Sequence, residues 1–118
     1  MARKNELRAY SRFRIPVVID APSVSDFPLI PEDVSAGGFC IISPRQLEVG
    51  VVFTCSIQTG EEVFGSCVGE VVWVREGPAA TPFWIMGISV KSLAGDRARL
   101  ATLLQKLSER LGLAITPD

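Results

Sequence analysis

Residues 51–60 read Val51-Val-Phe-Thr-Cys-Ser-Ile-Gln-Thr-Gly60, and this stretch decides the fold class. The apolar residues at positions 51, 53, 55 and 57 alternate with Val52 and three polar residues. This two-residue period is typical of a β-strand with one buried face. Thr59-Gly60 follows as a predicted hairpin turn. We therefore expect antiparallel β-structure at the centre of the chain.

Further strands are expected on both sides of this hairpin. Residues 62–74 are rich in valine and aromatic residues and are interrupted by Gly65 and Gly69, which predicts a long strand with a bulge or bend. Residues 84–90 alternate with one apolar face. At least five strands follow, and six are expected once the shorter ones are added, at 15–19, 27–30 and 39–43.

The hydrophobic period changes to that of a helix after Lys91. Leucines then recur on one helical face: Leu93, Leu100, Leu103, Leu104, Leu107 and Leu111. Ser92 or Asp96 can cap the start of this helix, and Gly112 suits its end. Short antiparallel strands followed by one amphipathic helix predict a small, mainly β barrel, because closure removes exposed strand edges.

Length and composition indicate an ordinary globular protein. The 118 residues are 47% hydrophobic and 21% charged, which suits one domain. We expect that domain to comprise a basic arm at 1–14, the barrel at 15–91 and the helix at 92–112. No apolar stretch approaches the roughly 18–20 residues of a membrane-spanning helix, and the first residues lack the apolar core of a signal peptide. The sequence predicts a cytoplasmic protein without membrane insertion.

Residue usage argues against an enzyme. The chain has no histidine, which removes the commonest general base and the commonest metal ligand. Calcium-loop, phosphate-loop and dinucleotide-binding motifs are absent as well. Cys40, Cys55 and Cys67 lie in apolar, strand-like runs, so we expect buried small side chains. No catalysis, metal or cofactor is predicted.

Charge is concentrated at the N-terminus. Residues 1–14 hold five basic side chains and one acidic side chain, whereas the other 104 residues hold seven basic and twelve acidic ones. Arginine forks fit phosphate oxygens and the acceptor edge of guanine, so Arg8 and Arg12 are candidate ligand-binding residues. A solvated basic terminus is the alternative. A nucleic-acid arm ranks below both, since the rest of the chain is acidic.

A second candidate site is the turn Asp33-Val-Ser-Ala-Gly-Gly38. One interpretation is structural, because Asp and Ser bond to backbone N–H groups in turns and glycine supplies positive φ. In the other interpretation, alternation aims Asp33 and Ser35 to the same side. The carboxylate can then accept hydrogen bonds from the N1–H and N2–H₂ edge of guanine, and Gly38 leaves room for a ligand near the backbone.

The two motifs, Arg8-x-x-x-Arg12 and Asp33-x-Ser35-x-x-Gly38, resemble in order and residue type those of the PilZ domain family, the bacterial receptors for cyclic di-GMP. The stretch Gly69-Glu-Val-Val-Trp-Val74, the last strand with its central Gly87 and the terminal helix extend the resemblance over nearly the whole chain. The resemblance implies a six-stranded antiparallel β-barrel with one C-terminal α-helix. It also implies that the basic arm folds over one face of the barrel when ligand binds.

The resemblance assigns a role to each motif residue. Arg8 and Arg12 would engage phosphate and the guanine acceptor edge. Asp33 and Ser35 would fix guanine and nearby phosphate or ribose groups, and Gly38 would serve the backbone. The implied function is a non-catalytic second-messenger receptor that relays the signal to an unidentified protein partner. The alternative is a PilZ-fold interaction adaptor that binds no nucleotide.

Neighbouring residues refine these expectations. Leu7 stands where many family members that take a stacked pair of ligands have another arginine, so one or two bound ligands are both open. Arg14 is expected to be solvated. Trp73 and Trp84 lie in apolar strands and are expected to pack in the core, with ligand stacking as the alternative. Tyr10 could cover a base or pack on the barrel.

Overall fold

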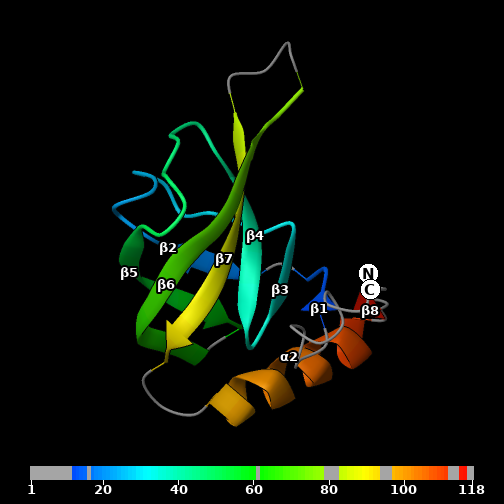
Figure 1. Cartoon of the computed structure of the whole chain (residues 1–118). Coiled ribbons are helices and arrows are strands. Elements are labelled where there is room, and N and C mark those ends of the chain that lie inside the picture. Colours follow the sequence, from blue (N-terminus) through cyan, green and yellow to red (C-terminus); the bar gives the residue numbers. More distant parts are fainter. Residues whose placement is uncertain are drawn as a thin grey trace, which may run out of the picture.

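The computed structural model describes residues 12–15, 17–60, 62–78, 83–93, 97–111 and 115–116. Strands make up most of this part, and one helix lies across the lower end of the sheet (Figure 1). The elements are β1 (Arg12–Phe13), β2 (Val18–Asp20), β3 (Asp33–Ser35), β4 (Gly38–Ser43), β5 (Val52–Thr59), β6 (Glu62–Glu76), β7 (Trp84–Ser92), α2 (Arg97–Leu111) and β8 (Ile115–Thr116). The predicted mainly β fold with a C-terminal helix is confirmed.

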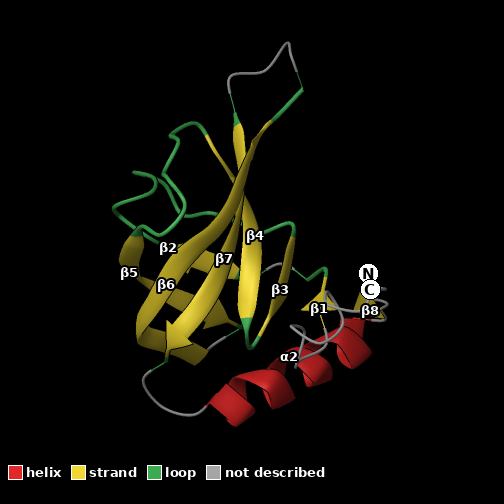
Figure 2. Ribbon diagram, viewed as in Figure 1, coloured by secondary structure: helices red, strands yellow, loops and turns green. Residues whose placement is uncertain are grey.

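The strands of the described residues form one sheet in the order β2-β5-β6-β7-β4-β3-β1-β8, and each neighbouring pair is antiparallel. Six antiparallel strands, β2 to β7, form a curled half-barrel (Figure 2). The two-residue strands β1 and β8 extend the sheet beyond β3. Pairings this short leave no hydrophobic period in the sequence, so the pattern did not predict them.

One of the six strands differs from the sequence prediction. The strand expected at 27–30 is reduced to an isolated bridge between Ile19 and Leu29. Pro28 and Pro31 flank this bridge and lack the N–H groups that a longer ladder needs. The sixth strand is instead β3, which begins at Asp33 within the motif that the sequence pattern assigned to a turn.

The core lies between the inner face of the sheet and the helix. Phe53, Cys55 and Ile57 of β5 are buried, as their alternation predicts. From the other side, Leu100 and Leu104 of α2 are fully buried in the same cluster. Burial of a leucine side chain contributes about 1.5–3 kcal/mol, so these two residues hold the helix against the sheet.

Bulges bend β6, the longest strand. Its first part pairs with β5 and its last part with β7. The register shifts between Phe64 and Cys67, where Ser66 has a φ of 52°, and again between Val71 and Trp73. An extra residue at a bulge increases the local twist. The predicted bend in this strand is confirmed, and it curls the sheet.

Candidate ligand-binding surface

The hairpin formed by β3 and β4 carries the second motif. Ser35 is directly paired with Gly38 at its closed end. The Ser35 hydroxyl accepts a hydrogen bond from the Gly37 N–H at 3.0 Å and donates one to the Gly38 carbonyl at 3.4 Å. The hydroxyl thus stabilises the turn, and Ser35 is only 7% exposed. The structural interpretation of the turn therefore accounts for the position of Ser35.

Glycine at position 38 is explained by the contact between β4 and β7. A Cβ atom at Gly38 would collide with the carbonyl oxygen of Ile88. The glycines recorded with positive φ are Gly50 and Gly60. At Gly38 it is therefore the close approach of the strands, and not a positive φ, that requires the missing side chain.

Two rows of directly paired residues cross β3, β4, β7 and β6 on one face of the sheet. The first row consists of Asp33, Cys40, Gly87 and Trp73. The second row consists of Ser35, Gly38, Ser89 and Glu70. Between them lies a buried row made of Val34, Phe39, Ile88 and Val71. Because successive residues of a strand point to opposite faces, the first two rows belong to the outer face.

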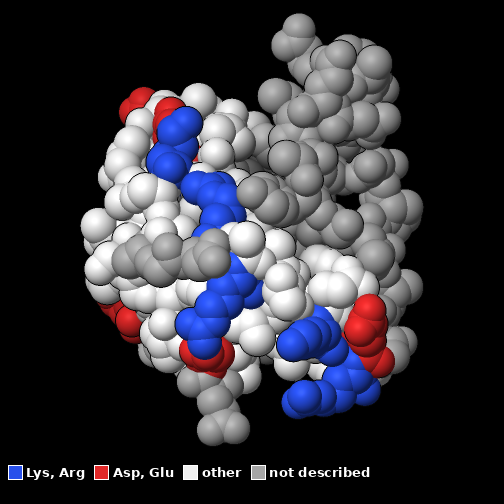
Figure 3. Space-filling view, turned by 90° about the horizontal axis from the view of Figure 1, so that it is seen from below, with Lys and Arg blue, Asp and Glu red and all other residues white. Residues whose placement is uncertain are grey.

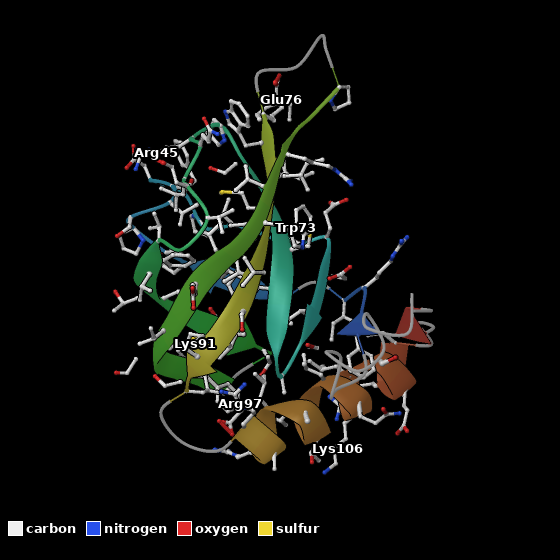
Figure 4. The ribbon with its side chains drawn as sticks, viewed as in Figure 1. Arg45, Trp73, Glu76, Lys91, Arg97 and Lys106 are labelled. Carbon is white, nitrogen blue, oxygen red and sulfur yellow. The ribbon has the colours of Figure 1, made fainter. Side chains whose placement is uncertain are left out.

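Trp73 lies on this outer face with 40% of its surface exposed. Its indole packs so closely on Gly87 that a Cβ there would collide with the ring, and the Arg75 guanidinium carbon lies 5.6 Å from the ring centroid. Figure 4 shows Trp73 beside the upper part of β4. The prediction of a core position for Trp73 is wrong, because the bulge after Val71 reverses the alternation. Trp84 is half-buried.

Strand β1 brings the end of the basic arm to the same hairpin. Phe13 pairs antiparallel with Val34, and both side chains are buried in the core. The antiparallel direction places the backbone of Arg12 next to the Ser35 end of β3. Arg8, Leu7 and Tyr10 lie outside the described residues. The structure therefore brings the backbone of Arg12, the second arginine of the first motif, next to the second motif, although the two motifs are separated in sequence.

Helix α2 contacts the motif turn through its first residue. Nη1 of Arg97 donates hydrogen bonds to the carbonyl of Ala36 at 3.2 Å and to the carbonyl of Val90 at 3.1 Å. The N–H of Val90 in turn donates to the carbonyl of Gly37 at 2.9 Å. No period or motif in the sequence marks this contact, because Arg97 follows Ala36 by 61 residues.

Basic side chains form a band on the lower face of the molecule, and acidic side chains lie beside parts of it (Figure 3). Lys91 pairs with Glu70 of the second row at 3.4 Å. Arg99 on the helix contacts Glu62. Each of these surface pairs contributes about 0–1 kcal/mol to stability.

The three cysteines are buried, as predicted, and none of them forms a disulfide. Cys55 and Cys67 face each other across β5 and β6. The hydrogen bond between their side chains and the burial of the pair raise the pKa of the Cys55 thiol well above its ordinary value. Within the described ranges, no cluster of three His, Cys, Asp or Glu residues could hold a metal ion.

Two shallow depressions open elsewhere on the surface. One adjoins β1 and is lined by Arg14, Ile15, Ile30, Pro31 and Glu32. The other lies by β2, β5 and β6 and is lined by Asp20, Pro22, Thr54, Cys55, Ser56, Ser66 and Val68. Asp33 and Ser35 line neither of them. Helix α2, the helix of the described residues, is not long and apolar enough to cross a membrane.

Comparison with solved structures shows the fold. The Bacillus subtilis inhibitor of motility (MotI/DgrA) matches with a TM-score of 0.71 at 16% identity, covering 87% of this chain and 52% of that one. The chain thus spans about half the length of that protein. The PilZ domain of YcgR from Escherichia coli, solved with c-di-GMP, matches with a TM-score of 0.62 at 15% identity, covering 89% and 96%.

Comparison of the sequence itself gives two results. The chain matches no curated protein. A family model described as PilZ domain matches residues 3–108, a range that includes residues 3–14 of the basic arm, every strand from β1 to β7 and most of helix α2. The chain therefore belongs to the PilZ domain family.

Proposed function

We propose that this protein is a non-catalytic receptor that binds cyclic di-GMP on the outer face of its half-barrel and relays the signal to a protein partner. The observation that carries the proposal is the pairing of Phe13 with Val34. This pairing sets the end of the arginine arm beside the strand that carries Asp33 and Ser35. The YcgR domain, which has the same fold, was solved with c-di-GMP.

The chemistry of the motif residues suits a phosphorylated guanine ligand. Arg8 and Arg12 would supply cationic forks for phosphate oxygens and the guanine acceptor edge. Asp33 would accept hydrogen bonds from guanine N1–H and N2–H₂. Ser35 and Gly38 would contribute through the turn, whose conformation the Ser35 hydroxyl and the close packing of β4 on β7 maintain.

Trp73 extends this proposed site along the first row. It lies three strand positions from Asp33, a separation of roughly 14 Å between backbones, and its indole reaches back over Gly87. Stacking of a base on an aromatic side chain contributes about 1–3 kcal/mol. We therefore include the exposed indole as an aromatic border of the ligand surface.

Ligand binding would fix the basic arm over this surface. Ordering a flexible segment costs conformational entropy, which lowers the affinity that the contacts alone would give. The same ordering changes the surface that a partner meets, so arm position is the proposed output. The proposed compartment is the cytoplasm, in keeping with three cysteines that are thiols and not disulfides.

Titration calorimetry with cyclic di-GMP tests the proposal. We expect the wild type to bind, and ligand at about 100 times its dissociation constant to stabilise the fold by roughly 2.7 kcal/mol. The double variant Arg8→Ala/Arg12→Ala should lose binding. Arg110→Ala, which removes an exposed arginine from the last turn of α2, is the matched control and should bind normally. No heat and no thermal shift with the wild type would overturn the proposal.

The adaptor alternative has one specific observation in its favour. Internal contacts already explain the Ser35 hydroxyl and the glycine at position 38 without a nucleotide. An adaptor would keep its cellular function after Arg8→Ala/Arg12→Ala substitution, whereas a receptor would lose it. The double variant therefore separates the two functions in cells as the titration does in solution.

A further inference from the structure

Arg97 joins helix α2 to the turn of the ligand-binding motif. One nitrogen, Nη1, donates to two carbonyl oxygens, those of Ala36 and Val90. Ala36 lies inside the motif, between Ser35 and the paired glycine. The Arg97 residue is half-buried, so these bonds are partly shielded from solvent. Charge-assisted hydrogen bonds are roughly twice as strong as neutral ones.

The contact closes a continuous set of hydrogen bonds around the turn. Val90, which accepts from Arg97 through its carbonyl, also donates its N–H to the carbonyl of Gly37. Within the same turn, the Ser35 hydroxyl accepts a hydrogen bond from the Gly37 N–H and donates one to the Gly38 carbonyl. The carbonyls of two successive turn residues are therefore held from outside the hairpin, one by β7 and the other by α2.

The helix has an independent attachment to the sheet. Leu100 and Leu104 are fully buried in the core cluster and lie one and two turns beyond Arg97. Loss of the guanidinium would therefore free the turn from the helix without removing the helix from the sheet. This separation lets the role of Arg97 be tested in a folded protein.

We propose that Arg97 is a positioning residue that holds the 35–38 turn in its ligand-binding conformation and couples that turn to the first turn of helix α2. The inference rests on the proposed function, because the ligand is cyclic di-GMP at the motif. The coupling to helix α2 would give the receptor a second output in addition to the position of the basic arm. A ligand that binds better when the turn is held must, by linkage, strengthen the hold of Arg97 on the turn.

Three variants separate this role from general stability. Arg97→Met keeps an unbranched stem and removes the guanidinium, and Arg97→Lys returns a cation. Arg99→Met is the matched control, since Arg99 is two residues away, exposed, and contacts Glu62 instead of the motif. We expect Arg97→Met to weaken cyclic di-GMP binding about tenfold. Arg97→Lys should recover part of the loss, and Arg99→Met should bind like the wild type.

Amide hydrogen exchange supplies a readout that a stability change alone would not give. Without ligand, Arg97→Met should speed exchange in the 35–38 turn, with α2 beyond Leu100 protected as in the wild type. With ligand, exchange in residues 97–100 should slow in the wild type and in Arg99→Met, but not in Arg97→Met.

The outcomes distinguish the two proposals. If the wild type binds and Arg97→Met matches it in affinity and in exchange, the positioning role is wrong and the proposed function stands. If Arg97→Met weakens binding but residues 97–100 still respond to ligand, the coupling is wrong. If the wild type does not bind cyclic di-GMP, the proposed function is wrong and this inference falls with it.

Discussion

The indole of Trp73 lies directly on Gly87 of the neighbouring strand, in the cross-strand row that begins at Asp33. A side chain at position 87 would occupy the space of the indole ring. The glycine in β7 therefore fixes where the aromatic residue of the outer face lies. The stability of a variant at position 87 therefore tests the position of Trp73, which borders the proposed ligand surface.

Substitution Gly87→Ala should displace the indole and lower the free energy of unfolding by about 1–3 kcal/mol, the usual cost of overpacking. Gly65→Ala in β6 is the control, because nothing lies within 4 Å of a Cβ atom built there. Urea denaturation of both variants measures the difference. Equal losses would show that the Trp73 contact does not constrain position 87.

Trp73 should report ligand binding by fluorescence. The chain has two tryptophans, so Trp84→Phe leaves Trp73 as the single emitter. Because the exposed indole borders the proposed site, cyclic di-GMP should change its emission with the same midpoint as the calorimetric titration. The reverse variant, Trp73→Phe, keeps Trp84 and should respond less. A ligand that binds without changing Trp73 emission lies on another face.

Helix docking should depend on the buried leucines. Leu104→Ala removes a fully buried side chain and should cost about 2–5 kcal/mol. Leu111→Ala, at a residue 51% exposed, should cost far less. Thermal or urea unfolding gives both values. Similar losses at the two positions would contradict the observed packing of α2 on the sheet.

Stability should decline in alkaline solution because of Cys55. The hydrogen bond to Cys67 and burial raise the pKa of its thiol in the folded state, whereas in the unfolded chain it ionises near pH 8.5. The folded state then holds a proton that the unfolded state has lost, so stability falls as pH rises above about 8.5. The same hydrogen bond lowers the pKa of Cys67, so the folded pair keeps one proton where the unfolded chain loses both. Unfolding free energies measured from about pH 8 to 10 should fall more steeply for the wild type than for Cys55→Ala/Cys67→Ala, with a limit of about 1.4 kcal/mol per pH unit. Parallel curves would contradict the raised pKa.

Much of the architecture follows from hydrophobic periods in the sequence. The alternation from Val51 to Ile57 predicts β5 and its buried face, and the leucine spacing predicts α2. These elements bury whole faces, so burial imposes a period on the sequence. The two short motifs placed the candidate site on the hairpin that the structure sets beside β1.

Other features depend on single local events that leave no period. One extra residue at the bulge after Val71 moves Trp73 to the outer face, although the surrounding strand reads as apolar. The Arg97 contact joins segments that are distant in sequence, and an arginine at a helix start has many possible partners. The pairing of Phe13 in the short strand β1 with Val34 likewise cannot be predicted from a hydrophobic period.

Comparison of cyclic di-GMP with cyclic di-AMP tests the central claim most directly. Adenine lacks the N1–H and N2–H₂ donors that Asp33 would bind, while the phosphates and the ring of the dinucleotide are retained. In parallel calorimetric titrations of the full chain, we predict that cyclic di-GMP binds and cyclic di-AMP does not, and that Asp33→Asn weakens the guanine ligand. Equal binding of both dinucleotides, or binding of neither, would contradict the account.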